Sequence, residues 1–303
     1  MQVKAITPRG YCKGVVRAIQ MAKNAQNEKQ PIYILGMIVH NQYIVDALKK
    51  RGIQTIDIPH LTRLELLDHV HEGTVIITAH GASEKVFQKA KEKGLNIIDA
   101  SCLDVIKTHD LIKARLDEGY EILYIGKKGH PEAEGAISIN EKKVHLITKK
   151  EDLQKIPENH SYVITNQTTM SLYDVYDLCE YAKTILPHVQ IEKETCKATQ
   201  IRQEAIKNMD EDIDIVFIVG DPHSNNTQKL ASIASQNKEV HMIECLDDLN
   251  IEWLKGKKKA AVSSGASTPT YLTNQVIDFL KQFDESNSQT FDKQPIDFTK
   301  ILD

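Results

Sequence analysis

Two kinds of hydrophobic pattern alternate along the chain, and together they predict its secondary structure. Short apolar runs rich in β-branched residues, bounded by turn residues, predict buried strands; these runs are IYILG, TVIITA, NIIDA, EILYIG, YVIT, VQIE, IVFIVG and AAVSS. Longer segments with apolar residues every three to four positions predict helices; these are Val15–Asn27, Asn41–Lys50, Glu84–Lys93, Val105–Leu116, Leu172–Ile185, Ala198–Lys207 and Leu272–Phe283. This alternation predicts an α/β protein with parallel sheets covered by helices.

Three cysteines occupy equivalent places in this pattern. Cys12, Cys102 and Cys196 each follow a predicted strand and precede a predicted helix, and they lie 90 and 94 residues apart. Solenoid repeats have periods of roughly 20–50 residues, so these spacings indicate domain-sized copies instead.

Two further positions recur at similar distances from each cysteine. The first, 28 residues on, is His40, His130 or Ser224, and each follows an apolar run and a glycine. The second closes each copy after another strand, and its three members are His80, Thr168 and Ser267. Because ligands bind outside the carboxyl ends of parallel strands, we expect the three copies to form one site around a pseudo-threefold axis.

The repeat suggests domain boundaries. We expect α/β units at residues 1–101, 102–195 and 196–283, followed by a polar C-terminal tail at residues 284–303. The tail gives no pattern that predicts whether it packs against the rest of the protein.

Composition narrows the classes of function and the compartment. The 303 residues carry a net charge of −4, so no basic field favours nucleic acid. No apolar run approaches the ~20 residues of a membrane span, and the N-terminus lacks a secretory signal pattern. Five cysteines are an odd number, which favours a cytoplasmic protein with reduced thiols. Cys179 and Cys245 lie in apolar patterns and are expected in the core.

Taken alone, each of the three repeated cysteines is typical of a small buried hydrophobe; their triplication indicates metal ligands. Helix N-termini favour the thiolate form. Zinc takes four ligands, often from C-x-x-C pairs, and this chain has no such pair. An iron–sulfur cluster with three cysteine ligands would keep one iron open for substrate. The spacing favours the cluster, and zinc remains the alternative.

The remaining polar residues indicate a phosphorylated substrate. Donors suited to phosphate oxygens come from five residues, although each loop alone is typical of a helix cap; they are His40, His80, Ser224, Asn226 and Ser267. Glu132 is the one acid among them. Its local pattern is that of an exposed first-turn glutamate, but beside a reducing cluster it is the natural proton source for loss of a hydroxyl as water. Thr168 is expected to orient substrate or to pass on the proton.

Nine motifs along the chain resemble those of one enzyme family. They are PRGYCKGVVRAI, VHNQYIVD, AHGAS, DASCLDVIKTH, GHPEAEG, NQTTMS, TCKATQIRQEAI, HSNNT and SSGASTP. In order and identity they resemble the 4-hydroxy-3-methylbut-2-enyl diphosphate reductase (IspH/LytB) family, over about Val3 to Leu280.

The resemblance implies a fold, a cofactor and a reaction. It implies a trefoil of three α/β units around one [4Fe–4S] cluster per chain, held by Cys12, Cys102 and Cys196. In the family the open iron binds the substrate hydroxyl, which leaves as water after two-electron reduction and protonation. The products are isopentenyl and dimethylallyl diphosphate, in the last step of the non-mevalonate isoprenoid pathway. The electrons are expected from reduced ferredoxin or flavodoxin, because the chain has no dinucleotide-binding fingerprint.

The resemblance also assigns residues to roles. Glu132 matches the proton donor, and the residues that match substrate-binding positions are His40, His80, His130, Thr168, Ser224, Asn225, Asn226 and Ser267. Asn225 stands where a serine is common, and Ser101-Cys102-Leu103 replaces the usual T-C-P, which is expected to loosen that loop slightly. From the residues alone, a zinc hydrolase acting on a phosphorylated compound and a non-catalytic iron–sulfur sensor stay open as alternatives.

Overall fold

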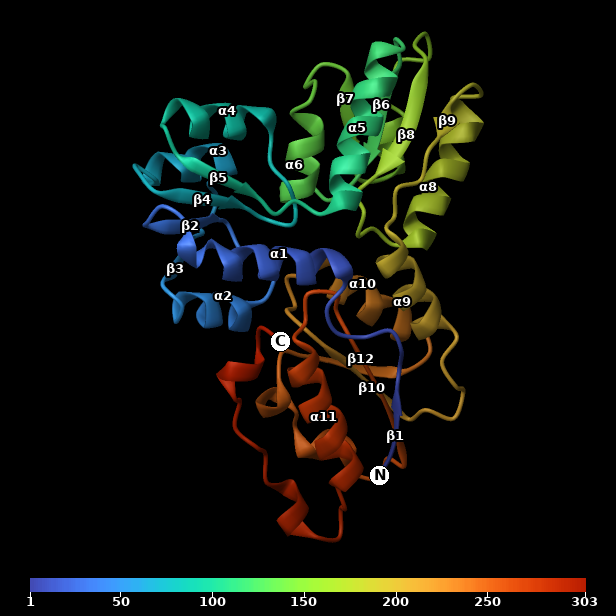
Figure 1. The fold of residues 1–303 in the computed structure, drawn as a ribbon. Helices are drawn as coiled ribbons and strands as arrows, with labels where there is room; N and C mark the ends of the chain where they lie inside the picture. Colours follow the sequence, from blue (N-terminus) through green and yellow to red (C-terminus); the bar gives the residue numbers. More distant parts are fainter. The chain divides into compact units, whose positions relative to one another are not determined.

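The computed structural model describes all residues from 1 to 303 and contains three four-stranded parallel sheets with flanking helices (Figure 1). The predicted α/β class is therefore confirmed. None of the helices combines the length and apolar character that crossing a membrane requires.

The three sheets share one strand order. The first is β3 (Ile53–Ile56), β2 (Ile32–Leu35), β4 (Thr74–Ile77) and β5 (Asn96–Asp99). The second is β7 (Val144–Ile147), β6 (Glu121–Ile125), β8 (Tyr162–Asn166) and β9 (Gln190–Ile191). The third is β11 (Glu239–Ile243), β10 (Ile215–Val219), β12 (Lys259–Ser264) and β1 (Gln2–Ala5). In every sheet the fourth strand is the one that leads into a repeated cysteine.

The N-terminal strand, β1, belongs to the third sheet. β1 is parallel to β12, with Gln2 opposite Lys259 and Ala5 opposite Val262. It therefore completes the sheet built by the last third of the chain, although the sequence placed it at the start of the unit at residues 1–101. Each sheet is thus completed by the strand that leads into the next repeated cysteine along the chain, and β1 fills that place for the third sheet.

Each of the seven predicted helical segments overlaps an α-helix, and four further α-helices are present. The α-helices are α1 (Lys13–Asn24), α2 (Gln42–Lys49), α3 (Arg63–Leu66), α4 (Glu84–Glu92), α5 (Leu103–Asp117), α6 (Pro131–Ile137), α7 (Lys150–Leu153), α8 (Leu172–Ile185), α9 (Lys197–Lys207), α10 (Asn225–Ala234) and α11 (Thr270–Gln282). The sequence pattern did not delimit the other four. α3 and α7 have only four residues each, α6 begins with a proline and contains a glycine, and α10 begins with polar residues.

The chain divides into two compact units. Unit 1 comprises Met1–Val15, His40–Ala47 and Lys197–Asp303, and contains the third sheet. Unit 2 comprises Val16–Val39 and Leu48–Cys196, and contains the first two sheets.

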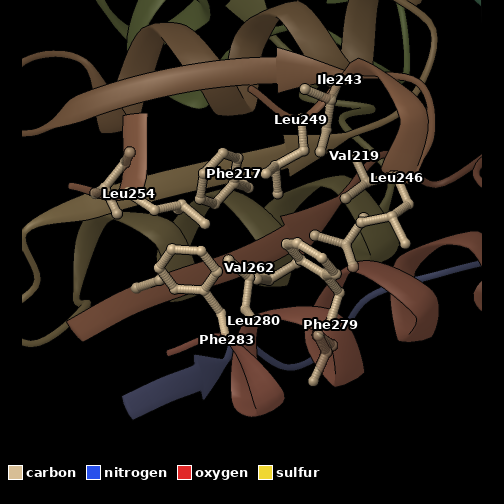
Figure 2. Packing of buried hydrophobic residues seen from close by; sticks show 14 residues of the cluster. Phe217, Val219, Ile243, Leu246, Leu249, Leu254, Val262, Phe279, Leu280 and Phe283 are labelled. Carbon is tan, nitrogen blue, oxygen red and sulfur yellow. The ribbon is translucent and has the colours of Figure 1, made fainter. Parts of the chain in front are cut away.

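A continuous apolar core supports the third sheet in unit 1 (Figure 2). Phe217 and Val262, from neighbouring strands, pack against Phe279, Leu280 and Phe283 near the end of α11. All of β10 is buried, as expected for a central parallel strand with helices on both faces. Replacing a buried phenylalanine by alanine in such a core typically costs about 3–5 kcal/mol.

In unit 2, the second sheet buries its two faces in separate clusters. Leu123 and Ile125 point to the face covered by α8, whereas Ile122 and Tyr124 point to the face covered by α5 and α6. Tyr124 is completely buried on the α6 side. The two remaining cysteines are also core residues, since Cys179 is fully buried and Cys245 nearly so, as predicted.

Candidate active site

The three sheets end in equivalent turns, which place the repeated polar residues. The N–H groups of Gly36, Gly126 and Gly220 donate to the carbonyls of Ile56, Ile147 and Ile243, each on the neighbouring edge strand. Four residues after these glycines come His40, His130 and Ser224. His130 and Ser224 are the N-caps of α6 and α10, while Asn41 caps α2 by accepting a hydrogen bond from the Ile44 N–H.

A second set of equivalent hydrogen bonds ties each cysteine to the loop after the third strand of its sheet. The N–H of Cys12 donates to the Ala266 carbonyl at 3.0 Å, that of Cys102 to Ala79 at 2.9 Å, and that of Cys196 to Thr168 at 3.0 Å. Ala266 and Ala79 directly precede Ser267 and His80. By this criterion the residue equivalent to Ser267 and His80 in the second sheet is Thr169, one position beyond the predicted Thr168.

Charged or amide side chains hold the chain just before each cysteine. Arg17 on α1 donates from Nη1 to the Ser101 carbonyl at 2.7 Å. Arg202 on α9 donates from Nη2 to the Gly10 carbonyl at 2.8 Å. Before Cys196, the Asn166 side chain donates to Thr195 Oγ1 at 2.8 Å and accepts from the Glu194 N–H at 3.0 Å.

These contacts could not be predicted from the sequence. Arg17 and Arg202 lie in helical segments with no local sign of their targets, which are 84 and 192 residues away. Asn166 is the last residue of β8, and its role in fixing the cysteine loop is visible only in the fold.

The acid centre of unit 2 is formed by Glu132 in the first turn of α6. Its carboxylate accepts hydrogen bonds from the Thr168 N–H at 2.6 Å and from Thr168 Oγ1 at 3.1 Å. The side chain is only 2% exposed, so the local expectation of a solvated first-turn glutamate does not describe it. Because the Thr168 carbonyl also accepts from the Cys196 N–H, one residue connects the acid to a cysteine loop.

The environment of Glu132 favours its protonated form. Burial raises the pKa of the Glu132 carboxyl to about 7, although the two hydrogen bonds from Thr168 lower it. The negative charge of Asp104 adds to the increase. Tyr124 lies beside the same carboxyl without completing a well-formed hydrogen bond. A carboxyl group with a pKa near neutrality can hold and release a proton at physiological pH.

Two of the predicted substrate-binding histidines meet in unit 2. The rings of His80 and His130 are edge to face, with centroids 5.4 Å apart and an interplanar angle of 89°. His130 Nδ1 accepts a hydrogen bond from the Glu132 N–H at 3.2 Å, which identifies Nδ1 as the unprotonated nitrogen. A neutral His130 therefore presents Nε2–H as a donor beside the acid centre.

The amide centre of unit 1 is formed by the N-terminus of α10 and the loop after β12. Both side-chain amide atoms of Asn226 are buried without a hydrogen-bond partner, in a residue only 4% exposed. A buried amide without partners costs free energy that a bound ligand can recover. Ser224, the N-cap, and Asn225 are equally buried.

Close packing brings the loop that carries Ser267 against this helix end. A Cβ atom on Gly265 would lie 2.3 Å from Thr227 Oγ1, and one on Gly220 would lie 2.8 Å from the same atom. Both positions thus require glycine for α10 to approach. On the other side of the loop, Ser267 Oγ donates to the His40 carbonyl at 3.1 Å. Four of the predicted phosphate-binding positions are thereby gathered within unit 1: His40, Ser224, Asn226 and Ser267.

The cysteines are suited to the iron–sulfur group that the resemblance implies. All three are half-buried residues directly before the first turn of a helix, where N–H groups and the helix dipole stabilise a thiolate. They come from three separate loops with equivalent backbone anchors, unlike the closely spaced pairs typical of structural zinc sites. The donor set therefore fits a cluster with three cysteine ligands.

Comparisons with known proteins show the family of this chain. The model of the LytB protein family matches residues 3–281. The chain belongs to the LytB family. Full-length relatives named 4-hydroxy-3-methylbut-2-enyl diphosphate reductase include those of Brevibacillus brevis, 50% identical over all of this chain and 99% of the relative, and Anoxybacillus flavithermus, 48% identical over all of this chain and 98% of the relative.

Solved structures of LytB family members have the same fold. The reductase from Plasmodium falciparum, described as an E-1-hydroxy-2-methyl-but-2-enyl-4-diphosphate reductase, superposes with a TM-score of 0.86 at 31% identity and covers 92% of this chain and 88% of its own. A second structure, described as the terminal enzyme of the non-mevalonate pathway, gives a TM-score of 0.67 at 29% identity over 93% of this chain and 100% of its own. The expected family and enzyme class, an oxidoreductase, are confirmed.

Proposed function

We propose that this LytB family member reduces (E)-4-hydroxy-3-methylbut-2-enyl diphosphate to isopentenyl and dimethylallyl diphosphate, the last step of the non-mevalonate pathway. The observation that carries the proposal is the buried Glu132 carboxyl, hydrogen-bonded to Thr168, whose carbonyl anchors Cys196. One residue thereby joins the proposed proton donor to a cysteine loop, which supports coupling of proton donation to reduction.

The overall reaction consumes two electrons and two protons. The C–O bond to the substrate hydroxyl breaks, one proton completes the departing water, and the other forms a C–H bond on the allylic fragment. We assign the cluster to Cys12, Cys102 and Cys196; when bound, it would supply the electrons and an iron with an open position for the hydroxyl oxygen.

The chain's own residues would bind the substrate and move the proton. The buried donors at the α10 N-terminus, Ser224, Asn225 and Asn226, together with Ser267 and the histidines His40 and His80, are suited to the diphosphate oxygens. Glu132 would hold the proton for the leaving hydroxyl, because its pKa of about 7 keeps a substantial protonated fraction at neutral pH. Thr168 fixes its carboxyl, and His130 would face the substrate beside it.

The electron source and the compartment are part of the same proposal. Reduced ferredoxin or flavodoxin would deliver the electrons one at a time. An oxygen-sensitive cluster and an odd number of cysteines are consistent with the cytoplasm.

Anaerobic purification tests the proposal. We expect a brown protein with about four iron and four sulfide per chain that converts the substrate when a reduced one-electron donor is supplied. A colourless, zinc-loaded protein that releases phosphate would overturn it in favour of a hydrolase. A brown protein without turnover under these conditions would instead indicate a sensor.

A further inference from the structure

The C-terminal tail follows a defined path over unit 1. The matched family region ends at residue 281, so the whole tail, residues 284–303, lies beyond it. After α11 the chain forms two short 3₁₀ turns, Ser288–Phe291 and Phe298–Lys300 (Figure 1, the red end of the chain). The polar sequence gave no reason to expect this path.

The first half of the tail packs against unit 1 next to the third sheet. Lys293 Nζ donates to the carbonyls of Asp247 at 2.8 Å and Leu249 at 2.7 Å. The Phe291 ring stacks on Phe283, with centroids 5.3 Å apart. These contacts direct the following residues back toward the N-terminal part of the chain.

The last residues are buried much more deeply than their polar surroundings suggest. Ile301 is fully buried and Leu302 is 6% exposed. Burying two such apolar side chains stabilises this end of the tail, which is therefore a stable contact rather than a frayed terminus.

These residues contact both N-terminal loops that carry predicted site residues. The Tyr11 hydroxyl donates to the Ile301 carbonyl at 2.5 Å, and Tyr11 directly precedes Cys12. The Phe298 ring packs against Tyr43, with centroids 6.2 Å apart, and Tyr43 lies in the first turn of α2, three residues after His40.

We propose that residues 297–302, here called the C-terminal clamp, hold the Cys12 loop and the His40 loop in place, and that Phe298 and Ile301 are the positioning residues within it. The inference rests on the proposed function only in treating Cys12 as an iron ligand and His40 as a substrate contact. The clamp acts on them through Tyr11 and Tyr43, and it touches neither reacting group itself.

Three variants and a control separate the clamp from general stability. One variant lacks residues 297–303, Tyr11→Phe removes the hydroxyl that donates to Ile301, and Tyr43→Ala removes the ring against Phe298. Lys300→Met is the matched control. Lys300 belongs to the clamp, but its contacts are with Asp297 and the Tyr271 ring, away from Tyr11 and Tyr43.

The first readout is the rate at which anaerobically purified enzyme loses iron to a chelator, well below its unfolding temperature. We expect the truncated enzyme to lose iron at least about tenfold faster, since two buried side chains are lost, and Tyr11→Phe about fivefold faster, since one hydrogen bond is lost. Tyr43→Ala should instead raise KM while kcat stays within about twofold of wild type.

The control, Lys300→Met, should match wild type in iron loss and in KM. Wild-type iron loss and KM in the truncated enzyme would overturn the clamp.

The second readout separates this inference from the proposed function. Alkylation of each cysteine by iodoacetamide is followed by mass spectrometry in wild-type and truncated protein as isolated. The clamp predicts faster modification of Cys12 in the truncated protein, with Cys102 and Cys196 unchanged. If wild type proves to contain no iron, the proposed function fails, yet this selective change would still support the clamp. Equal acceleration of alkylation at all three cysteines would show that the truncation loosens the whole protein, and it would overturn the clamp.

Discussion

The N-termini of α6 and α10 occupy the same place in two copies of one fold, yet they have become chemically different. Each helix begins after the turn formed by an equivalent glycine, with His130 or Ser224 as its N-cap. The second helical residue is Glu132 in α6 and Asn226 in α10, and both are nearly completely buried. In unit 2 this position is an acid, and in unit 1 it is a neutral amide.

Their partners differ as much as their charges. The Glu132 carboxylate is satisfied by two hydrogen bonds from Thr168, whereas neither amide atom of Asn226 has a partner. An internally satisfied acid is suited to holding a proton, and an unsatisfied amide is suited to receiving a ligand. In the proposed function, one backbone position therefore serves proton donation in one repeat and anion binding in another.

The largest effect is expected from removing a proposed ligand of the iron–sulfur cluster, because both helix ends would act on the substrate that the cluster reduces. Cys102→Ser should lose most of its iron and reduce turnover by more than the roughly hundredfold typical of changes around a metal ligand. Iron content and activity are measured together, with Cys179→Ala, a buried core cysteine in α8, as the control. Full iron occupancy with a normal rate in Cys102→Ser would contradict the three-ligand assignment.

The acid side of the comparison is tested by Glu132→Gln. This isosteric change keeps an acceptor for the Thr168 hydrogen bonds but removes the transferable proton, so kcat should fall by at least ~10²-fold with substrate affinity retained. Steady-state kinetics and a substrate-perturbed spectrum of the iron centre measure the two quantities separately. Near-normal turnover would remove Glu132 from the proton pathway.

The amide side should show the opposite kinetic pattern. Asn226→Ala removes a buried donor for an anionic ligand, so KM should rise about tenfold while kcat stays within about twofold, as for loss of one charge-assisted hydrogen bond. Ser232→Ala, farther along α10, is the control. A fall in kcat with unchanged KM would show that the two helix ends do not divide their functions in this way.

Much of this division could be predicted from the sequence. The features that could not be predicted depend on contacts between residues far apart in the chain. The spacing of Cys12, Cys102 and Cys196 predicted three copies, because a regular spacing can be read directly from the sequence. It could not show that β1 completes the third sheet, since strand pairing over more than 250 residues leaves no local pattern. Glu132 had the pattern of an exposed glutamate, because the groups that bury it come from β6 and from the loop after β8.

The pH dependence of turnover gives a smaller effect of definite sign. Burial raises the pKa of Glu132 to about 7, and the proposed mechanism needs its protonated form, so kcat should fall as pH rises, by about threefold between pH 6.5 and 7.5. Glu132→Gln should show no such step in its residual activity. A kcat that rises over this range would exclude Glu132 as the acid.

The same shift affects stability. Between about pH 4.5 and 7 the unfolded chain releases the Glu132 proton while the folded protein retains it, so this residue lowers the free energy of unfolding as pH increases. Denaturant unfolding of wild type and Glu132→Gln should therefore show stabilities that diverge over this window, with the variant favoured at pH 7. Parallel curves would mean that Glu132 is already ionised in the folded protein.

The smallest effect separates the two functions proposed for Thr168. Its hydroxyl hydrogen bond lowers the pKa of Glu132, so Thr168→Val, which keeps the backbone N–H bond, should raise that pKa and move the kcat profile to higher pH. If Thr168 only orients the carboxyl, the limiting kcat at low pH should stay within about threefold of wild type, the value of one neutral hydrogen bond. If the hydroxyl passes the proton on, kcat should fall at every pH, because valine offers no oxygen. Thr168→Ser, which restores the hydroxyl, should then recover the wild-type rate, and only that recovery would make Thr168 part of the proton path.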